Sequence, residues 1–443
     1  MTYEDFRDRL FQTALKSGCS AAETYYVEGD TFSVNILEGE MDRYVVSKTS
    51  ALGLRVQVKG RNGYSYTEAL EDPARLVDHA IDNANVIEND DESPMQGRCE
   101  YEQVTPPESP LNLMDEQQKI KLAKELEQAA KSEDSRVIRM GHCLTASFST
   151  AVRIDNTLGL SAQKRINSGY CVACPILSHE GQMKNAFAFR SGKNAADIQS
   201  CAEEAVRKAA AQFGSASAAP GRYRIVLHAD AAADFFEAFS PMFSADAAQK
   251  GLSPLRGKEK QRIGSELITI IDDPLHPDNP SAFDDEGTPS VAKTVVDRGV
   301  LMTLLHNLKT AKKAGVESTS NASRPGPGSP VGVAPSNFYV APGEKDLSEL
   351  LFEMDNGILI TELSGLHSGV HPVSGEFSLL AKGHLVEDGK TIRPVDQITI
   401  AGKFLALLDS VRAVGSDLRF SIPGDSRFGS PSLYIEEVMV SGK

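Results

Sequence analysis

Residues 214–221, which read GSASAAPG, separate two stretches of different character, and this separation constrains the fold more than any other feature. The segment is small, flexible and free of apolar periodicity, as interdomain linkers are. Before it, long helical patterns alternate with strand-like runs. After it, short strand-like runs predominate among many glycines and prolines. Because 443 residues are also too many for one compact core, we expect two domains, over residues 1–219 and 220–443.

The acidic composition limits the class of partner. The formal net charge is −15, and such a surface repels phosphate backbones, so we expect no direct contact with nucleic acid. No apolar run is long enough to span a bilayer, so we expect no membrane contact. The charged, amphipathic N-terminus does not resemble a signal peptide. The expected location is therefore the cytoplasm, where the six irregularly spaced cysteines are expected to be free thiols.

The first half begins with a helix, a β-meander and a second helix. An apolar stripe after the cap-like Thr2 predicts a helix over residues 2–18. Alternating apolar and polar residues then predict a meander, with a hairpin turn at residues 61–63 (Arg-Asn-Gly). Asp72, which a proline follows, predicts the start of the next helix.

The same order of elements is expected a second time before the linker. Asp115 is placed to cap a helix, alternating segments follow over residues 136–190, and a helical pattern covers residues 195–211. A duplicated helix–meander–helix unit is therefore expected. The first domain should be α+β, with an antiparallel sheet and helices.

The second half is expected to be mostly β, which makes the whole chain α+β. Its strand-like runs lie at residues 268–271, 293–296, 300–305, 338–340, 358–360 and 433–440.

Three groups of residues resemble metal-binding patterns, and each also has a structural interpretation. Cys171 and Cys174 form a Cys-x-x-Cys pair, but on a strand two residues three apart point to opposite faces, which favours buried thiols. His367 and His371 have a helical ligand spacing, yet glycines and a proline surround them. On a strand they would lie roughly 13 Å apart, too far for one ion.

The third group is the acidic run Asp284-Asp285-Glu286, which precedes a glycine. Three carboxylates could hold a hard cation. The run lacks the alternating ligand pattern of a calcium loop, however, so we expect a solvated turn. The nucleophile elbow, phosphate-binding loop, dinucleotide-binding loop and His-Glu-x-x-His patterns are also absent from the sequence. We therefore find no complete catalytic or metal-binding set.

The second half contains an ordered series of motifs that resembles the TldD/PmbA family, known as modulators of DNA gyrase and as a metalloprotease system. The series comprises SAFDDEGTPSVAKTVVDRGVLMTLLHNLKTAKKAG, GVHPVSGEFSLLAKGHLVEDG, PVDQITIAGKFLALL and the final SPSLYIEEVMVSGK. The resemblance extends over essentially the whole chain, including the N-terminal half that begins with a helix.

The resemblance also identifies what this chain lacks. The TldD-like branch carries His-Glu-x-x-x-His on a helix after the linker, and a cysteine near the C-terminus, as metal ligands. Here the corresponding positions are Phe236, Glu237 and Pro241, and no cysteine follows Cys201. Phenylalanine and proline cannot ligate zinc. The nearby His228 is expected at a strand end and makes no site alone.

The resemblance therefore implies a TldE/PmbA-type subunit with no catalytic residues, cofactor or metal of its own. A TldD-like partner would supply zinc, and the heterodimer would degrade or process unfolded peptides. A homodimer is the alternative assembly. The neighbouring phenylalanines Phe235, Phe236 and Phe239 are expected to be core, although an apolar face toward the partner is an alternative.

Two other functions stay open at this stage. One is a peptidase that acts alone with a degenerate metal site built from His367, His371 and the acidic run. The other is a regulatory binding protein that acts on DNA gyrase through protein contacts.

Overall fold

The computed structural model describes residues 1–86 and 93–442, and it has an α+β fold. The first half contains helices α1 Tyr3–Lys16, α2 Pro73–Val86, α3 Pro110–Leu113, α4 Glu116–Glu133 and α5 Ile198–Ala210, and the 3-10 helix η1 Gly192–Asn194. Its strands are β1 Ala21–Leu37, β2 Glu40–Val58, β3 Arg61–Thr67, β4 Val137–Asn156, β5 Ser161–His179, β6 Gln182–Asn185 and β7 Ala188–Ser191.

The second half is richer in strands. Its helices are α6 Ala229–Phe239, η2 Ser240–Phe243, α7 Ala245–Gln249, α8 Leu308–Ala314, α9 Leu347–Met354, α10 Leu366–Gly369 and α11 Phe404–Asp409. Its strands are β8 Gly221–Leu227, β9 Ile270–Asp272, β10 Lys293–Asp297, β11 Val300–Leu301, β12 Ala322–Ser323, β13 Gly332–Val333, β14 Asn337–Val340, β15 Gly357–Ser364, β16 Val370–His371, β17 Glu376–Glu387, β18 Lys390–Lys403, β19 Val411–Val414, β20 Arg419–Phe420, β21 Arg427–Ser430 and β22 Leu433–Ser441.

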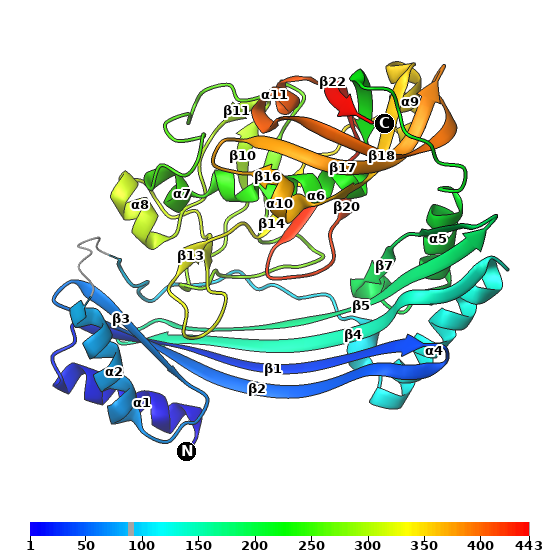
Figure 1. Ribbon diagram of the computed structural model, residues 1–443. Coiled ribbons are helices and arrows are strands. Elements are labelled where there is room, and N and C mark those ends of the chain that lie inside the picture. The colour runs from blue at the N-terminus through cyan, green and yellow to red at the C-terminus, as the bar shows by residue number, and fades with distance from the viewer. Residues whose placement is uncertain (87–92, 443) are drawn as a thin grey trace.

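One long antiparallel sheet organises the first half, in the order β3-β2-β1-β4-β5-β6, with β7 also paired to β5. Helix, antiparallel strands and helix follow one another twice along the chain, with β1–β3 between α1 and α2 and β4–β7 between α4 and α5. Helices α1 and α2 pack at one end of the sheet, and α4 and α5 pack at the other (Figure 1), so two separate cores share the sheet. The second half lies over the remaining face of the curved strands (Figure 1).

The helix starts follow the expected capping chemistry. Thr2 accepts a hydrogen bond from the amide of Asp5 at the start of α1, and Asp115 forms a reciprocal capping box with Gln118 at the start of α4. Helix α2 begins at the expected proline. Helix α5 starts three residues later than expected, because Asp197 caps it through the amide of Ser200.

The expected hairpin turn at residues 61–63 is wrong. The β2–β3 turn is at Lys59 and Gly60, which have φ angles of 49° and 81°. Both central residues of such a turn need positive φ, so the Lys-Gly step competes successfully with Asn-Gly. Gly63 instead pairs with Val56 inside β3. A Cβ atom at Gly63 would lie 1.8 Å from the carbonyl oxygen of Ala80 on α2, so the glycine permits close packing of this helix.

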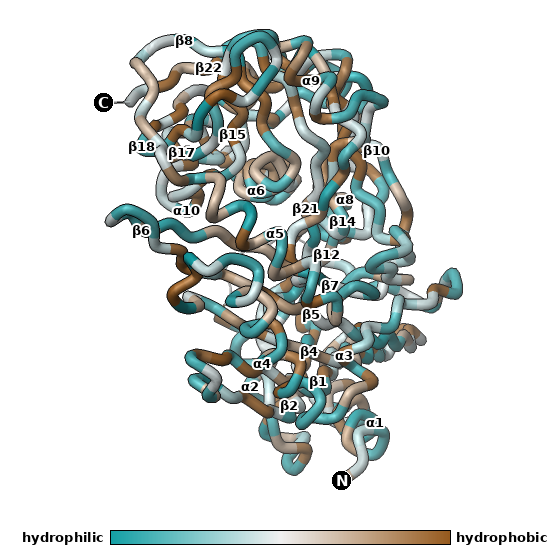
Figure 2. The backbone as a smooth tube through the Cα atoms, turned by 90° about the vertical axis from the view of Figure 1, so that its right-hand side faces the viewer, coloured by the Kyte–Doolittle hydropathy of each residue, from teal (hydrophilic) through white to brown (hydrophobic). Residues whose placement is uncertain are grey.

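Each of the six strand-like runs expected in the second half contains a strand, but β11 covers only residues 300–301 of the run 300–305, and the long strands β17 and β18 lie outside these runs. The strands of this half form one sheet in the order β15-β8-β22-β18-β17-β16, with β19 on β22, and another in the order β11-β10-β9-β14-β21-β20. Helix α6 lies between the sheets, and Figure 2 shows it almost end-on, surrounded by strands. The largest apolar core of the described residues surrounds this helix.

The cysteines behave as expected of free thiols. Cys171 and Cys174 both lie on β5 and both are buried. Cys171 belongs to the core beneath α4 and α5, whereas Cys174 accepts a hydrogen bond from the Asn185 side chain at 3.6 Å. Across residues 1–86 and 93–442, no helix combines the length and apolar character needed to cross a membrane.

Candidate functional site

Helix α6 carries the positions at which the resemblance placed a metal motif, and its packing is that of a core helix. Phe235, Phe236 and Phe239 are at most 1% exposed. The ring of Phe239 stacks on Phe404 with 4.5 Å between centroids, and Phe235 meets Phe377 edge-on at 5.1 Å. Such pairs add to the free energy of burial. The expectation that these phenylalanines are core is therefore confirmed.

The three motif positions do not combine into a metal site. Phe236 is buried and offers no ligand atom. Pro241 is exposed in η2, after α6 has ended at Phe239. Glu237 keeps an exposed surface, although the surrounding protein partly shields its carboxyl group from water and raises its pKa. These three residues do not form a zinc site, so we derive no zinc-dependent step at this helix.

His228 lies where a strand-end histidine was expected. It follows β8 and caps α6, where its Nδ1 atom accepts a hydrogen bond from the amide of Asp230 at 3.3 Å. Burial, partly offset by Asp230, lowers the pKa of His228. It is therefore a neutral capping group near neutral pH.

His367 and His371 lie on two different short elements. His367 is in the single turn of α10, a helical turn that the surrounding glycines had argued against, whereas His371 is in β16. Both histidines are exposed. In the part of the chain that the structure describes, no group of three or more histidine, cysteine or carboxylate side chains is arranged to hold a metal ion.

The acidic run is not the expected solvated turn, and this prediction is wrong. Asp284 is 7% exposed and Glu286 is 1% exposed. The Asp284 carboxylate accepts hydrogen bonds from the amides of Glu286, Thr288 and Ala322 at 2.9–3.0 Å. Burial raises the pKa of Asp284 to about 6 despite these donors. The carboxylate therefore organises the loop.

The other two acids of the run connect the two halves of the chain. Asp285 lies 3.3 Å from the Lys164 ammonium of β5. Glu286 lies 3.4 Å from the Arg55 guanidinium of β2 and accepts a hydrogen bond from the amide of Leu308. Burial raises the pKa of Glu286 to about 7, an effect that Arg55 opposes.

Glu23 of β1 extends this buried ion network. It lies 3.8 Å from Arg55 and forms an ion pair with Arg324 of the second half. The Arg324 guanidinium also lies 4.8 Å from the centre of the Tyr25 ring. The network therefore ties the sheet to the loop before β13. Each of its carboxylates is paired with a protein cation, although the Oε2 atom of Glu23 has no hydrogen-bond partner.

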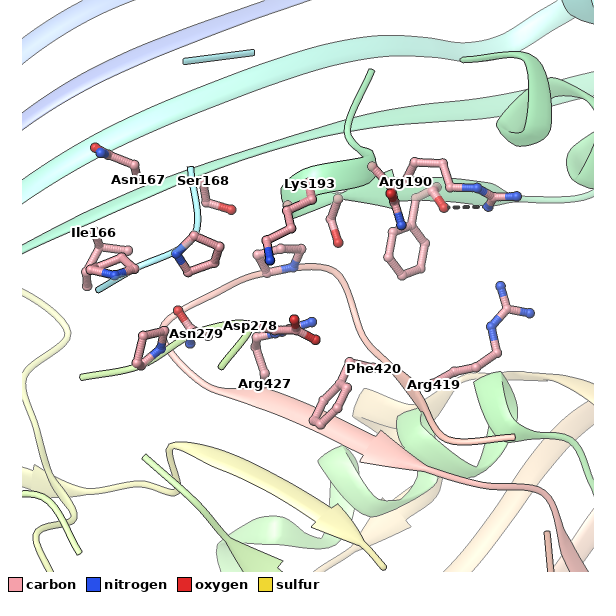
Figure 3. Close-up of a pocket in the computed structure, with 18 of the residues that line it drawn as sticks. Ile166, Asn167, Ser168, Arg190, Lys193, Asp278, Asn279, Arg419, Phe420 and Arg427 are labelled. Atoms are coloured by element: carbon pink, nitrogen blue, oxygen red, sulfur yellow. Dashed lines mark hydrogen bonds between the residues drawn. The ribbon is translucent and has the colours of Figure 1, made fainter. Parts of the chain in front are cut away.

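A second feature lies between the halves: a cleft of about 450 Å³, which Figure 3 shows in close-up. The first half contributes the outer part of β5, β7 and η1. The second half contributes β20, β21 and the loop that carries Asp278 and Asn279. Because these segments are far apart in the sequence, no local pattern predicts the cleft.

Glu204 of α5 forms the most highly charged corner of the cleft. Its carboxylate lies 2.8 Å from Arg190, 2.8 Å from Lys208 and 3.0 Å from Arg419. Burial would raise the pKa of Glu204, but these three cations together lower it to about 2. Arg419 also lies 3.1 Å from Asp230 at the start of α6. The N-terminus of α6 is thereby fixed to the first half.

Comparisons with known proteins identify this arrangement. Three domain descriptions of the PmbA/TldA metallopeptidases match the chain: domain 1 over residues 22–84, the central domain over residues 109–213, and the C-terminal domain over residues 220–442. The chain belongs to the PmbA/TldD family.

Individual relatives agree with the family. A "Metalloprotease" of Methanothermobacter thermautotrophicus is 33% identical over 56% of this chain and 56% of its own length. A "Metalloprotease PmbA homolog" of Haemophilus influenzae is 25% identical over 97% of this chain and 94% of its own.

Two crystal structures share the fold over nearly the whole chain. A candidate modulator of a DNA gyrase from Thermotoga maritima is 34% identical, with a TM-score of 0.91 over 99% of this chain and all of that one. TldE from Thermococcus kodakarensis is 20% identical, with a TM-score of 0.89 over 99% of this chain and all of that one. At this lower identity the likeness to TldE shows the fold alone.

Within the PmbA/TldD family fold, α6 belongs to the matched C-terminal domain, whereas the cleft is formed jointly with the central domain. The sequence feature that could have pointed to the cleft is the presence of Arg190, Lys193, Arg419 and Arg427 in a chain that is acidic overall.

Proposed function

We propose that this chain is the TldE/PmbA-type, non-catalytic subunit of a metallopeptidase complex that degrades or processes unfolded peptides. A TldD-like partner would hold the zinc and supply the chemistry. The observation that carries the proposal is the state of α6: the first ligand position of the motif is Phe236, which is 1% exposed in an aromatic core.

The packing of α6 argues against a small local change that would restore a site. A metal-binding side chain at position 236 would have to turn out of the core. It would then lose the edge-on contact that Phe236 makes with Phe404, whose ring centroid is 5.8 Å away. At position 241 the backbone is already in η2, and a proline there interrupts helical continuity. The rigid core instead suits a subunit that braces a partner and lines a shared substrate cavity.

The experiment that tests the proposal is reconstitution. This chain, a TldD-like chain from the same cell and their mixture are assayed against an unfolded peptide, and complex formation is followed by size-exclusion chromatography. We expect a heteromeric peak, and cleavage that requires the TldD-like chain. Equal cleavage by this chain alone would overturn the non-catalytic role. Formation of a homodimer only, with no association, would overturn the partnership.

A link to DNA gyrase is the second candidate, because the Thermotoga maritima neighbour carries that description. Affinity purification of this chain from its native cell separates the two. Recovery of a TldD-like chain supports the peptidase role, whereas recovery of topoisomerase subunits without it supports the gyrase role.

A further inference from the structure

Arg427 is a buried cation on the second-half wall of the cleft, and the described residues give its side chain no hydrogen bond or ion pair. It begins β21 and is 7% exposed. Its Nε atom is buried and has no hydrogen-bond partner, and Asp278 is the carboxylate that influences its charge. The guanidinium lies 4.7 Å from the centre of the Phe420 ring. Burying a charge without a partner costs free energy, so a site that retains one invites an anionic ligand.

The surroundings of Arg427 do not supply that anion. Burial lowers the pKa of Arg427, and the opposing attraction comes from Asp278. Asp278 is exposed and makes no described hydrogen bond to Arg427. The other two arginines of the cleft, Arg190 and Arg419, differ because both are paired with Glu204.

A second unpaired cation faces Arg427 across the cleft. Lys193 in η1 is exposed, and the described residues provide no ion pair for it. Figure 3 shows Lys193 projecting from the first half and Arg427 rising from the second, with the cleft between them. In a chain with a net charge of −15, two unpaired cations on opposite walls of one cleft favour an anionic ligand.

The backbone of β5 indicates what kind of molecule carries the anion. Strand β5 pairs with β7 over Tyr170–Ala173 and with β6 over Ile176–His179. Along residues 161–169, no described strand pairs with the edge of β5 that faces away from β4. Three consecutive residues of this stretch line the cleft: Ile166, Asn167 and Ser168. An open strand edge offers backbone donors and acceptors to an extended peptide.

We propose that this cleft binds a carboxylate-bearing, extended peptide, with Arg427 as the buried anchor, Lys193 on the opposite wall and the open edge of β5 along the peptide backbone. The proposal rests on the proposed function, in which the chain handles unfolded peptides, and it assigns a place and a charge preference to that handling. Arginine suits this task because its planar fork matches a carboxylate.

The test is fluorescence anisotropy of the full-length chain with a labelled, unstructured peptide that contains glutamates and ends in a free carboxylate. Two further peptides locate the carboxylate: one has an amidated C-terminus, and the other has glutamine in place of each glutamate. We expect at least about tenfold weaker binding for one of them, and binding that weakens as salt rises. Methylation of alternate backbone amides of the peptide should also weaken binding, because it blocks pairing with β5.

The protein variants are Arg427→Met, Lys193→Gln and the control Lys390→Gln. Lys390 is exposed on β18 outside the cleft. We expect Arg427→Met to weaken binding at least about tenfold and Lys193→Gln about threefold to tenfold, with no change for the control. The melting temperature separates the roles of Arg427. An anion-binding arginine is buried at a cost, so Arg427→Met should leave the melting temperature equal or raise it by about 1–2 °C. A structural arginine would give a fall.

The outcomes distinguish this proposal from the proposed function. If the wild-type chain binds all three peptides equally well and both cleft variants bind as the wild type does, the carboxylate site is wrong and peptide handling stands. If Arg427→Met lowers the melting temperature and Lys193→Gln binds normally, the site is also wrong. Loss of peptide cleavage by the reconstituted complex would instead contradict the proposed function.

Discussion

Glu204 of α5 and Arg419 of β20 lie 3.0 Å apart and join the first half of the chain to the second. Arg419 also contacts Asp230 at 3.1 Å, and Lys208 bridges both acids at 2.8 Å. The charges form a closed network and not an isolated surface pair, so their contribution to stability should be measurable. The N-terminus of α6 is held by this network.

Replacement of Glu204 tests the network. Because the folded-state pKa of Glu204 is lowered to about 2, its contribution is present above the unfolded pKa of about 4.5 and is lost as the pH falls toward 2. We expect Glu204→Gln to lower the free energy of unfolding by about 2–3 kcal/mol at pH 7, and by less at pH 3. Urea denaturation at both pH values measures this. The neighbouring Glu203→Gln is the control, because Glu203 is exposed on the same helix. Equal effects of both variants would contradict the network.

Asp234 of α6 should destabilise the fold at neutral pH. Burial, together with Glu237, Asp230 and Glu362, raises its pKa to about 7. The folded state therefore binds a proton more tightly than the unfolded state, and stability falls as the pH rises from about 4 to 7. We expect Asp234→Asn to stabilise the chain by about 1–2 kcal/mol at pH 8 and by less at pH 5. Thermal melts across this range test the trend.

Asp82→Asn serves as the control for Asp234, because Asp82 is exposed on α2. A stabilisation by Asp234→Asn that is the same at pH 5 and pH 8 would show that the carboxylate does not titrate as described.

The aromatic core around α6 predicts a large effect of truncation. Phe239 is fully buried and stacks on Phe404, so Phe239→Ala should cost about 3–5 kcal/mol of stability. Phe352→Ala should change stability by less than about 0.5 kcal/mol, because Phe352 is 79% exposed. Denaturant unfolding of the two variants compares them directly. A small effect at Phe239 would mean that α6 is not a rigid core helix.

Among the positions that the family resemblance assigns to the metal motif, Glu237 alone would keep the residue type of the active branch, and we expect it to be dispensable for catalysis. Among the described residues, no group of three or more histidine, cysteine or carboxylate side chains surrounds it that could hold a metal, so we expect no metal-bound water for it to activate. Glu237→Gln in this chain should leave peptide cleavage by the reconstituted complex within about twofold of wild type. The matching glutamate-to-glutamine change in the TldD-like chain is the comparison. A decrease of about two orders of magnitude in the cleavage rate of the Glu237→Gln complex would show that Glu237 takes part in the reaction.

Local chemistry made much of the fold predictable. Thr2, Asp115 and the proline after Asp72 locate three helix starts, because a cap acts over only a few residues. The strands follow from alternation. Alternation and turn residues do not fix the position of the hairpin turn, because Lys59-Gly60 and Asn62-Gly63 both suit positive φ. The close packing of α2 against Gly63 favours the turn at Lys59-Gly60.

The site depends on contacts that no local pattern contains. Glu286 contacts Arg55, 231 positions before it, and Asp284 accepts a hydrogen bond from the amide of Ala322, 38 positions after it. Likewise, Arg427 and Lys193 face one cleft only because the second half folds over the sheet. The absence of metal ligands at Phe236 and Pro241, by contrast, is a prediction of the family resemblance, because it needs only the residue type at a position and no contact between distant segments.

The central claim is that this chain holds no catalytic metal, and metal analysis tests it most directly. The chain and a TldD-like partner are purified separately, and the zinc bound per chain is measured together with chelator-sensitive peptide cleavage. We predict substoichiometric zinc and no cleavage for this chain, and stoichiometric zinc for the partner. One tightly bound zinc in this chain, with cleavage that a chelator abolishes, would contradict the account.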